Sequence, residues 1–496
     1  MKTLFYSLIF GVILGLMLHG CAKQPETIVI EDSPESPQAP PAPDTAVSPI
    51  ETADFRQLIL GEIHPVPTLD PLFADNNSAK RTLQLLYEGL VRYDRDGEIV
   101  PAAAKRWSVG GDSLSYVFTL RNDLYYHDSD IFSSGLGRKV VAGDVKFAFE
   151  RMARNGVPSD AAELFMAIEG FQPYFQEQHN VLNPAYRQIS SVSGIQAPND
   201  TTVAFVLDER DPHFLQKMAS PYASVYPSEA VAENPLDFTP VGSGPFELSQ
   251  QVGDSVYIFS EFENYPRPGG DPSSLDRVDV VIEQNESNLL KALAAGDIHA
   301  IPELGPQIIR NILTPQGELS PAYSTDYIFS TPGGFTTYSL LHNPASSVSR
   351  SGVRSIFSRV DPAPLSQNIP ADIVQVETVP DSVSVPSAEQ PSTIYSTFWT
   401  DPFQRWFLQQ LSTQWRGQPK LQIVNIRTPS KHTALYTSSF VPFYPGHSAM
   451  INSNMLVKYT VKQATLSINE IEDLRFNRYP WWINVRTVDM PGIDEL

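Results

Sequence analysis

Side chains that could bind a metal or transfer protons are scattered along this chain. The nine histidines stand singly, and only His127 is directly next to an acidic residue, Asp128, with Asp130 close by. Two carboxylates and an imidazole are a ligand set that a divalent cation can use. The surrounding stretch is polar, however, and such a stretch more often forms a solvated loop. We therefore predict no metal site and no cofactor.

Sequence patterns that carry catalysis are missing from the chain. It lacks the P-loop pattern G-x-x-x-x-G-K-[ST], the dinucleotide pattern G-x-G-x-x-G and the zinc pattern H-E-x-x-H. It also lacks the nucleophile patterns G-x-S-x-G and S-x-x-K. Catalytic triads assemble from distant residues, so this absence favours a binding protein without excluding an enzyme. We predict no catalytic residues, and a hydrolase acting on envelope material stays a minor alternative.

Composition limits the classes of partner. The 496 residues include 56 acidic against 35 basic side chains, a net charge of −21. Binding to a phosphate backbone depends on Lys and Arg, so nucleic acid is not an expected partner. A single cysteine excludes an intramolecular disulfide framework and a Cys-rich zinc site. A hydrophobic fraction of 42% is enough for a sizeable core.

The single cysteine stands at the end of a short apolar segment. Lys2 precedes the apolar run from Leu4 to Leu18, and Leu18-His19-Gly20-Cys21 follows. The run has the length of a signal-peptide core and is short for a membrane span. The four final residues resemble the lipobox of bacterial lipoproteins, which implies cleavage before Cys21 and lipidation of its sulfur. The alternative is an ordinary cysteine after an uncleaved helix.

The next segment is rich in proline and acidic residues. Residues 21–54 contain seven prolines among Glu, Asp, Ser and Ala, so we interpret them as an extended tether. Removal of residues 1–20 takes away Lys2 and no acid, which leaves 34 basic against 56 acidic residues and a net charge of −22. We expect an extracytoplasmic or periplasmic body, lipid-anchored to the cell membrane or the outer membrane.

The folded part begins near residue 55 and mixes strands with helices. This mixture predicts an α/β or α+β architecture. Apolar alternation and turn residues predict strands over 56–61, 115–120, 201–207, 278–283 and 421–426, with a hairpin over 90–101. Helical periodicity predicts helices over 78–87, over 145–152 with Asp144 as N-cap, over 285–296 and over 403–415. The proline-rich stretch 361–394 should hold only short elements.

Several segments between residues 65 and 300 carry short motifs in a fixed order. They are Pro67–Pro71, Leu86–Tyr93, Ala103–Trp107, Tyr116–Arg121 with His127–Asp128, Ala142–Arg151, Pro240–Phe246 and Ala294–Ile298. Each alone is a weak signal, but their order and spacing resemble those of the extracellular solute-binding protein family 5. Its members are the oligopeptide, dipeptide and nickel binders of ABC importers. In that family the stretch around His127 resembles a structural turn.

The resemblance implies a two-lobed, type II periplasmic-binding-protein-like fold with a small extra subdomain in the first lobe. It implies a first lobe over 55–262, including the subdomain over about 90–165. A second lobe would follow over 263–438, and 439–496 would return to the first lobe. The match fades beyond residue 300, so we expect the second lobe to be reduced and divergent.

The resemblance also implies a function. We expect a substrate-binding protein, and not an enzyme, that takes a peptide or other small molecule into a cleft and delivers it to an ABC permease in the inner membrane. An extended peptide could bond to the backbone at Ile63 and His64. Asp401 is the candidate for the ligand's ammonium group and Trp399 for a pocket wall. We expect a monomer. The alternative is a non-transporting lipoprotein of the same descent, acting as a receptor adaptor or scaffold.

Overall fold

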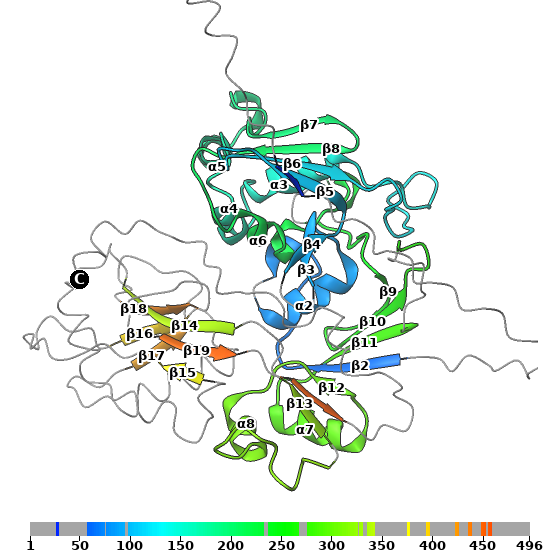
Figure 1. The fold of residues 1–496 in the computed structure, drawn as a ribbon, viewed down its shortest axis with the longest axis vertical. Coiled ribbons are helices and arrows are strands. Elements are labelled where there is room, and N and C mark those ends of the chain that lie inside the picture. The colour runs from blue at the N-terminus through cyan, green and yellow to red at the C-terminus, as the bar shows by residue number, and fades with distance from the viewer. Residues whose placement is uncertain are drawn as a thin grey trace, which may run out of the picture.

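The protein is described here by a computed structural model. It covers residues 57–330 except 75, 95–97, 233–236, 267–274 and 326, together with short strands at Glu26–Ile28 and between Phe335 and Lys458. The described strands form three larger sheets and one two-stranded ribbon, with most described helices beside the first two sheets (Figure 1). The helix predicted over 403–415 lies outside the described residues.

A seven-stranded sheet has the order β13-β20-β12-β2-β11-β10-β9. β2 runs parallel to β11 and β12, and the remaining neighbours are antiparallel. The predicted strands at 56–61 and 278–283 are confirmed as β2 and β11. The strands are β2 (Gln57–Glu62), β9 (Phe246–Val252), β10 (Val256–Glu261), β11 (Arg277–Ile282), β12 (Ala300–Ile301), β13 (Tyr327–Ser330) and β20 (Met455–Lys458).

Helix α2 (Asn77–Leu86) packs its leucines against β2, β10 and β11 in one apolar core. It confirms the helix predicted over 78–87. The side chain of Asn76 caps it, because Asn76 Oδ1 accepts from the backbone N–H of Ala79 at 2.9 Å. After α2 the chain forms the antiparallel ribbon of β3 (Val91–Tyr93) and β4 (Ile99–Pro101), which confirms the predicted hairpin.

The second sheet is antiparallel throughout and has the order β1-β5-β6-β8-β7. Its core is aromatic: the ring of Phe205 lies 5.8 Å from that of Phe118 and 5.0 Å from that of Phe149. β1 comes from the stretch interpreted as a tether and pairs with β5. The strands are β1 (Glu26–Ile28), β5 (Ala104–Val109), β6 (Ser115–Leu120), β7 (Ile195–Asn199) and β8 (Thr202–Val206).

The helices around these two sheets are short. Two of them, α3 and α7, confirm the helices predicted over 145–152 and 285–296. The helices beyond α2 are α3 (Ala142–Met152), α4 (Ser159–Leu164), α5 (Phe171–Asn180), α6 (Phe214–Met218), α7 (Glu286–Ala295) and α8 (Pro306–Ile312), with 3-10 turns η1 (Pro71–Phe73), η2 (Pro184–Tyr186), η3 (Pro221–Ala223) and η4 (Ser228–Ala230).

The N-cap predicted for α3 was wrong. The cap residue is Val141, and Asp144 is the third residue of the helix. Asp144 Oδ2 accepts from the backbone N–H of Val141 at 3.0 Å, and the two Asp144 oxygens also bind the Arg138 guanidinium at 2.7 and 2.8 Å. A carboxylate in the first turn can thus accept a hydrogen bond from the backbone N–H of the cap residue. The sequence pattern alone does not distinguish this position from the N-cap position.

A buried ion pair joins the turn η1 to helix α3. Asp70 Oδ1 accepts from Arg151 Nη1 at 2.8 Å, and the second carboxylate oxygen binds Arg151 Nη2. The Arg151 side chain is fully buried, and it also donates to the Tyr226 hydroxyl at 3.3 Å. The contact therefore fixes the second sheet's helix α3 to the chain segment that enters α2.

The segment Pro240–Phe246, one of the motifs shared with the family, passes close to the end of α2. The backbone N–H of Gly244 donates to the carbonyl of Leu86 at 2.9 Å, and a Cβ at Gly242 would collide with the same carbonyl. Gly242 O accepts from the backbone N–H of His127 at 2.8 Å. Glycine is required here by the close approach of two backbones.

The third sheet is described by its backbone strands, in the order β15-β19-β14-β18-β16-β17. β17 confirms the strand predicted over 421–426, and only short strands occur in the described part of 361–394. β16 runs parallel to β17 and β18, and the other pairs are antiparallel. The strands are β14 (Phe335–His342), β15 (Val374–Val376), β16 (Thr393–Ser396), β17 (Gln422–Asn425), β18 (Leu435–Ser438) and β19 (Ser448–Asn452).

Candidate functional site

A buried polar cluster lies where β2 and β12 end. Glu62 is the last residue of β2, and Glu303 follows β12. Because these strands are parallel, their carboxyl ends lie at the same edge of the sheet, which is where ligands bind in open α/β folds. The start of α2 meets this edge. We call the group formed by Glu62, His64, Asn77, Ser78, Arg81 and Glu303 the β2–α2 cluster.

Arg81 is the centre of the β2–α2 cluster. Its Nε and Nη2 donate to the two Glu62 oxygens at 2.8 and 2.6 Å, and Nη2 also donates to Glu303 Oε2 at 3.0 Å. The Ser78 hydroxyl donates to Glu62 Oε2 at 2.6 Å. Two carboxylates from different strands thus share one guanidinium, and this ties β2 and the segment after β12 to α2.

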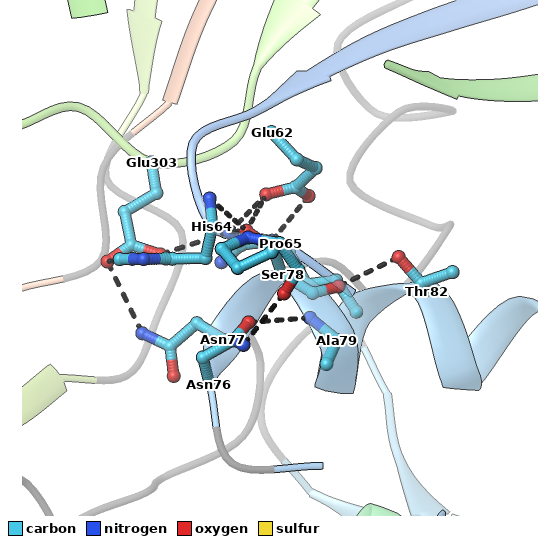
Figure 2. A network of polar contacts seen from close by, with 10 residues as sticks. Glu62, His64, Pro65, Asn76, Asn77, Ser78, Ala79, Thr82 and Glu303 are labelled. Atoms are coloured by element: carbon cyan, nitrogen blue, oxygen red, sulfur yellow. Dashed lines mark hydrogen bonds and ion pairs between the residues drawn. The ribbon is translucent and has the colours of Figure 1, made fainter. Parts of the chain in front are cut away.

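His64 and Asn77 complete the cluster on the side of Glu303 (Figure 2). Asn77 Nδ2 donates to Glu303 Oε1 at 3.4 Å, and His64 Nε2 lies 3.8 Å from the same oxygen. The backbone N–H of His64 donates to the Ser78 hydroxyl at 3.3 Å. The turn that leaves β2 is therefore held to α2 through its backbone, and its histidine ring faces the segment after β12.

The residues around the cluster fix the start of α2. Asn76 Nδ2 donates to the carbonyl of Pro65 at 2.9 Å, while its Oδ1 caps the helix. Thr82 Oγ1 donates to the carbonyl of Ser78 at 2.8 Å. Proline at position 65 provides no backbone donor and has a fixed φ, so the chain leaves β2 in an extended, well-defined path.

Burial controls the electrostatics of the cluster. Burial alone would raise the pKa of Glu303, but the nearby His64 ring and the positive charge of Arg81 outweigh it and hold that pKa at about 2. Burial likewise opposes the charge on Arg81, and the two carboxylates still raise its pKa above the ordinary value. Both carboxylates are engaged by a permanent cation, and through them the cluster ties three backbone segments together.

Two of the residues predicted to contact ligand lie at this edge. Ile63 and His64 follow β2 directly and are 3% and 0% exposed. The structure brings His64 into the β2–α2 cluster. Cys21, Trp399 and Asp401 lie outside the described residues, so their predicted roles stay predictions.

Sequence reasoning missed the charged members of the cluster. Arg81 falls off the apolar stripe of α2, yet it is 2% exposed because α2 is covered on nearly all sides. Glu62 ends one short apolar strand and Glu303 follows another, and that repeated position was the available signal. It becomes informative only once the two strands are known to be parallel neighbours.

His127 is buried in the loop after β6. It is 3% exposed, its Nε2 lies 3.0 Å from the carbonyl oxygen of Gly244, and its ring meets that of Phe262 edge to face. Burial lowers its pKa to about 4, since the neighbouring carbonyl and Asp128 offset only part of that effect. Asp128 accepts from the backbone N–H of Gly137 at 2.8 Å.

Two absences hold for the described residues. No group of three or more His, Cys, Asp or Glu side chains is arranged to hold a metal ion in that part of the chain. Within the same residues, no helix is both long and apolar enough to cross a membrane.

Comparison with known proteins relates this chain to a family of binding proteins. The model of the family "Bacterial extracellular solute-binding proteins, family 5 Middle" matches residues 98–355. The di/tripeptide-binding protein 1 of Pseudomonas aeruginosa is 28% identical over 222 residues, which are 43% of this chain and 38% of that protein. The chain is thus matched to less than half the length of this relative.

Solved structures agree on the fold. The periplasmic binding protein DppA of Helicobacter pylori, in complex with the peptide STSA, has a TM-score of 0.57 and 17% identity over 77% of each chain. OppA of Haemophilus influenzae, in complex with RPPGFSPFR, has a TM-score of 0.59 and 14% identity, over 78% of this chain and 80% of that one. The predicted two-lobed α/β fold is confirmed, and the chain belongs to family 5 of the bacterial extracellular solute-binding proteins.

Proposed function

We propose that the protein is a lipid-anchored, extracytoplasmic peptide-binding protein of an ABC importer. The observation that carries the proposal is the family match together with relatives and fold neighbours that bind peptides. A buried, ion-paired cluster at the carboxyl end of β2 adds support, because a binding wall must keep its backbone in place while ligand comes and goes.

The ligand would lie along the turn that leaves β2. Backbone groups at Ile63 and His64 would bond to an extended peptide, and the β2–α2 cluster holds that turn through the His64 N–H and the Ser78 hydroxyl. Asp401 would receive the ligand's ammonium group and Trp399 would form a wall of the pocket. Main-chain recognition with one charged anchor suits peptides of varied sequence.

The mechanism is a shift between open and closed forms of two lobes. Ligand that contacts both lobes binds the closed form better and increases its population. A tenfold preference for the closed form corresponds to about 1.4 kcal/mol of differential binding. The closed form would then deliver the peptide to a permease in the inner membrane, with Cys21 lipid keeping the monomer at the membrane surface.

Calorimetry with defined dipeptides, tripeptides and longer peptides tests the binding function. We expect saturable binding with one site. Asp401→Ala should weaken it about 10- to 100-fold, the loss expected for a charge-assisted hydrogen bond. Asp200→Ala, at an exposed turn of the second sheet, is the control and should bind normally. Full affinity with Asp401→Ala would contradict the assigned role of Asp401.

A protein that binds none of these peptides would favour the second candidate, a non-transporting lipoprotein used as an adaptor or scaffold. The match to less than half of the curated relative's length is the observation that keeps this candidate. Peptide uptake by cells, compared with and without the gene, separates transport from binding alone.

A further inference from the structure

Two large apolar side chains project from the turn after α5. Leu182 is 74% exposed and Tyr186 is 72% exposed, and they are the two most exposed large apolar side chains in the described part of the chain. They stand four positions apart, on either side of Pro184. Two exposed apolar side chains close together indicate a contact surface when the backbone that carries them is fixed.

The turn that carries them is built by its own hydrogen bonds. Asn183 Oδ1 accepts from the backbone N–H of Ala185 at 3.0 Å and starts η2. Arg187 Nε donates to the carbonyl of Val181 at 3.1 Å. The Glu177 carboxylate accepts from the backbone N–H groups of residues 188 and 189, both at 2.6 Å. The exposed side chains are therefore presented by a defined backbone.

The surrounding segment is electrically neutral. Residues 171–199 contain one acidic side chain, Glu177, and one basic side chain, Arg187, in a chain of net charge −21. Both of these charges are used inside the turn. An anionic membrane surface, which repels the acidic body as a whole, has no such reason to repel this segment.

Strand β7, which follows the turn in the chain, starts at the same end of the second sheet as β1. One row of paired residues crosses all five strands of this sheet: Glu26, Val109, Tyr116, Phe205 and Ile195. The row joins the first residue of β1 to the first residue of β7. Both strands therefore start at the same end of the sheet, about 19 Å apart across four strand spacings.

The exposed turn and the predicted lipid site are both connected by short stretches of chain to that end of the sheet. The turn after α5 precedes Ile195 in the chain, and the backbone N–H of Gly194 bonds to the carbonyl of Glu169 at 2.8 Å, next to the start of α5. Cys21 lies five residues before Glu26, which allows a separation of at most about 18 Å. Figure 1 shows the five-stranded sheet, with α5 beside it, apart from the seven-stranded sheet.

We infer that Leu182 and Tyr186 insert into the membrane interface beside the lipid anchor. The inference rests on the proposed lipidation of Cys21. Tyrosine suits the boundary between headgroups and acyl chains, and leucine adds apolar area below it. With β1 paired to β5, the lipid holds this end of the sheet at the bilayer, and the two side chains give the body a second contact that fixes its orientation.

Fluorescence quenching by lipid tests this inference. Since Cys21 is the single cysteine, a thiol introduced by Ala185→Cys in the full acylated protein is the one free thiol for an environment-sensitive fluorophore. The protein is placed in vesicles of phosphatidylethanolamine and phosphatidylglycerol that carry a nitroxide near the headgroup. The matched control is Asp200→Cys, which lies at the β7–β8 turn and so at the opposite end of the sheet. Mass spectrometry confirms acylation.

We expect strong quenching at position 185, little at position 200, and a large loss of the quenching at 185 when Leu182→Ser and Tyr186→Ser are added. Equal quenching at both positions, none at either, or full quenching in the double serine variant would overturn the inference while the anchor stands. An unacylated Cys21 would overturn both the anchor and the inference. Both substituted side chains are exposed, so the variants should unfold at the temperature of the parent.

Discussion

His127 gives a quantitative test of how the first two sheets are packed together. Burial lowers its pKa from an ordinary value of 6.5 to about 4 in the folded protein. The unfolded chain therefore takes up a proton as pH falls through 6.5, whereas the folded chain stays neutral until about pH 4. The stability that this residue contributes is complete above pH 6.5, decreases between these values and is absent below pH 4. The difference in pKa corresponds to about 3 kcal/mol in total, of which about 2 kcal/mol is lost at pH 5.

Urea unfolding at pH 7.5 and pH 5.0 measures this loss. The comparison protein is His127→Gln, whose amide does not titrate and can still donate to the carbonyl of Gly244. Relative to this variant, the parent protein should lose about 2 kcal/mol of unfolding free energy between the two pH values. Carboxylates with a lowered pKa, such as Glu229 and Glu303, titrate in both proteins and cancel in the difference. Replacement of the exposed His213 by Gln is the control and should leave the pH dependence of the parent unchanged.

The refuting result is simple to recognise. If the parent and His127→Gln lose the same free energy on acidification, His127 is not held neutral by burial. The loop around His127 would then pack less tightly against the segment Pro240–Phe246 than the structure shows.

Three further substitutions probe the buried contacts, each measured by urea unfolding. Asp70→Asn should cost about 3–5 kcal/mol because it leaves a buried guanidinium without its carboxylate, whereas Asp123→Asn, at a half-exposed surface pair, should cost less than about 1 kcal/mol. Arg81→Met should also cost about 3–5 kcal/mol, since two buried carboxylates lose their shared cation, and a stable Arg81→Met protein would contradict the central role given to that residue. Gly242→Ala should cost at least about 1–3 kcal/mol through collision with a backbone carbonyl, while Gly111→Ala, with open space around it, should be neutral.

Local elements could be predicted from the sequence because their signals are local. β6 begins and ends where the alternation of residues 115–120 indicates, with Tyr116, Phe118 and Leu120 buried on one face. The helix predicted over 285–296 is α7, which Asn285 caps and Gly296 closes with a φ of 86°. The family motifs predicted the fold as well, because their order and spacing over residues 65–300 carry information about distant parts of the chain.

The candidate site could not be predicted in the same way. The β2–α2 cluster depends on β12 lying beside β2, although the two strands are separated by more than two hundred residues of chain. Periodicity gives a helix one buried face, whereas α2 is enclosed by the sheet on one side and by later segments on others. Arg81 is buried for this reason, and its two carboxylate partners become visible only in three dimensions.

The position of β20 has a consequence for the time at which the protein can fold. β20, which ends at Lys458, lies between β12 and β13, and β2 pairs with β11 at a separation of 220 residues (Gln57 to Arg277). Pairings of such range close long loops before they gain contacts, so they form slowly. Because the seven-stranded sheet includes one of the last described strands, this sheet is complete only after the chain as far as β20 has been made.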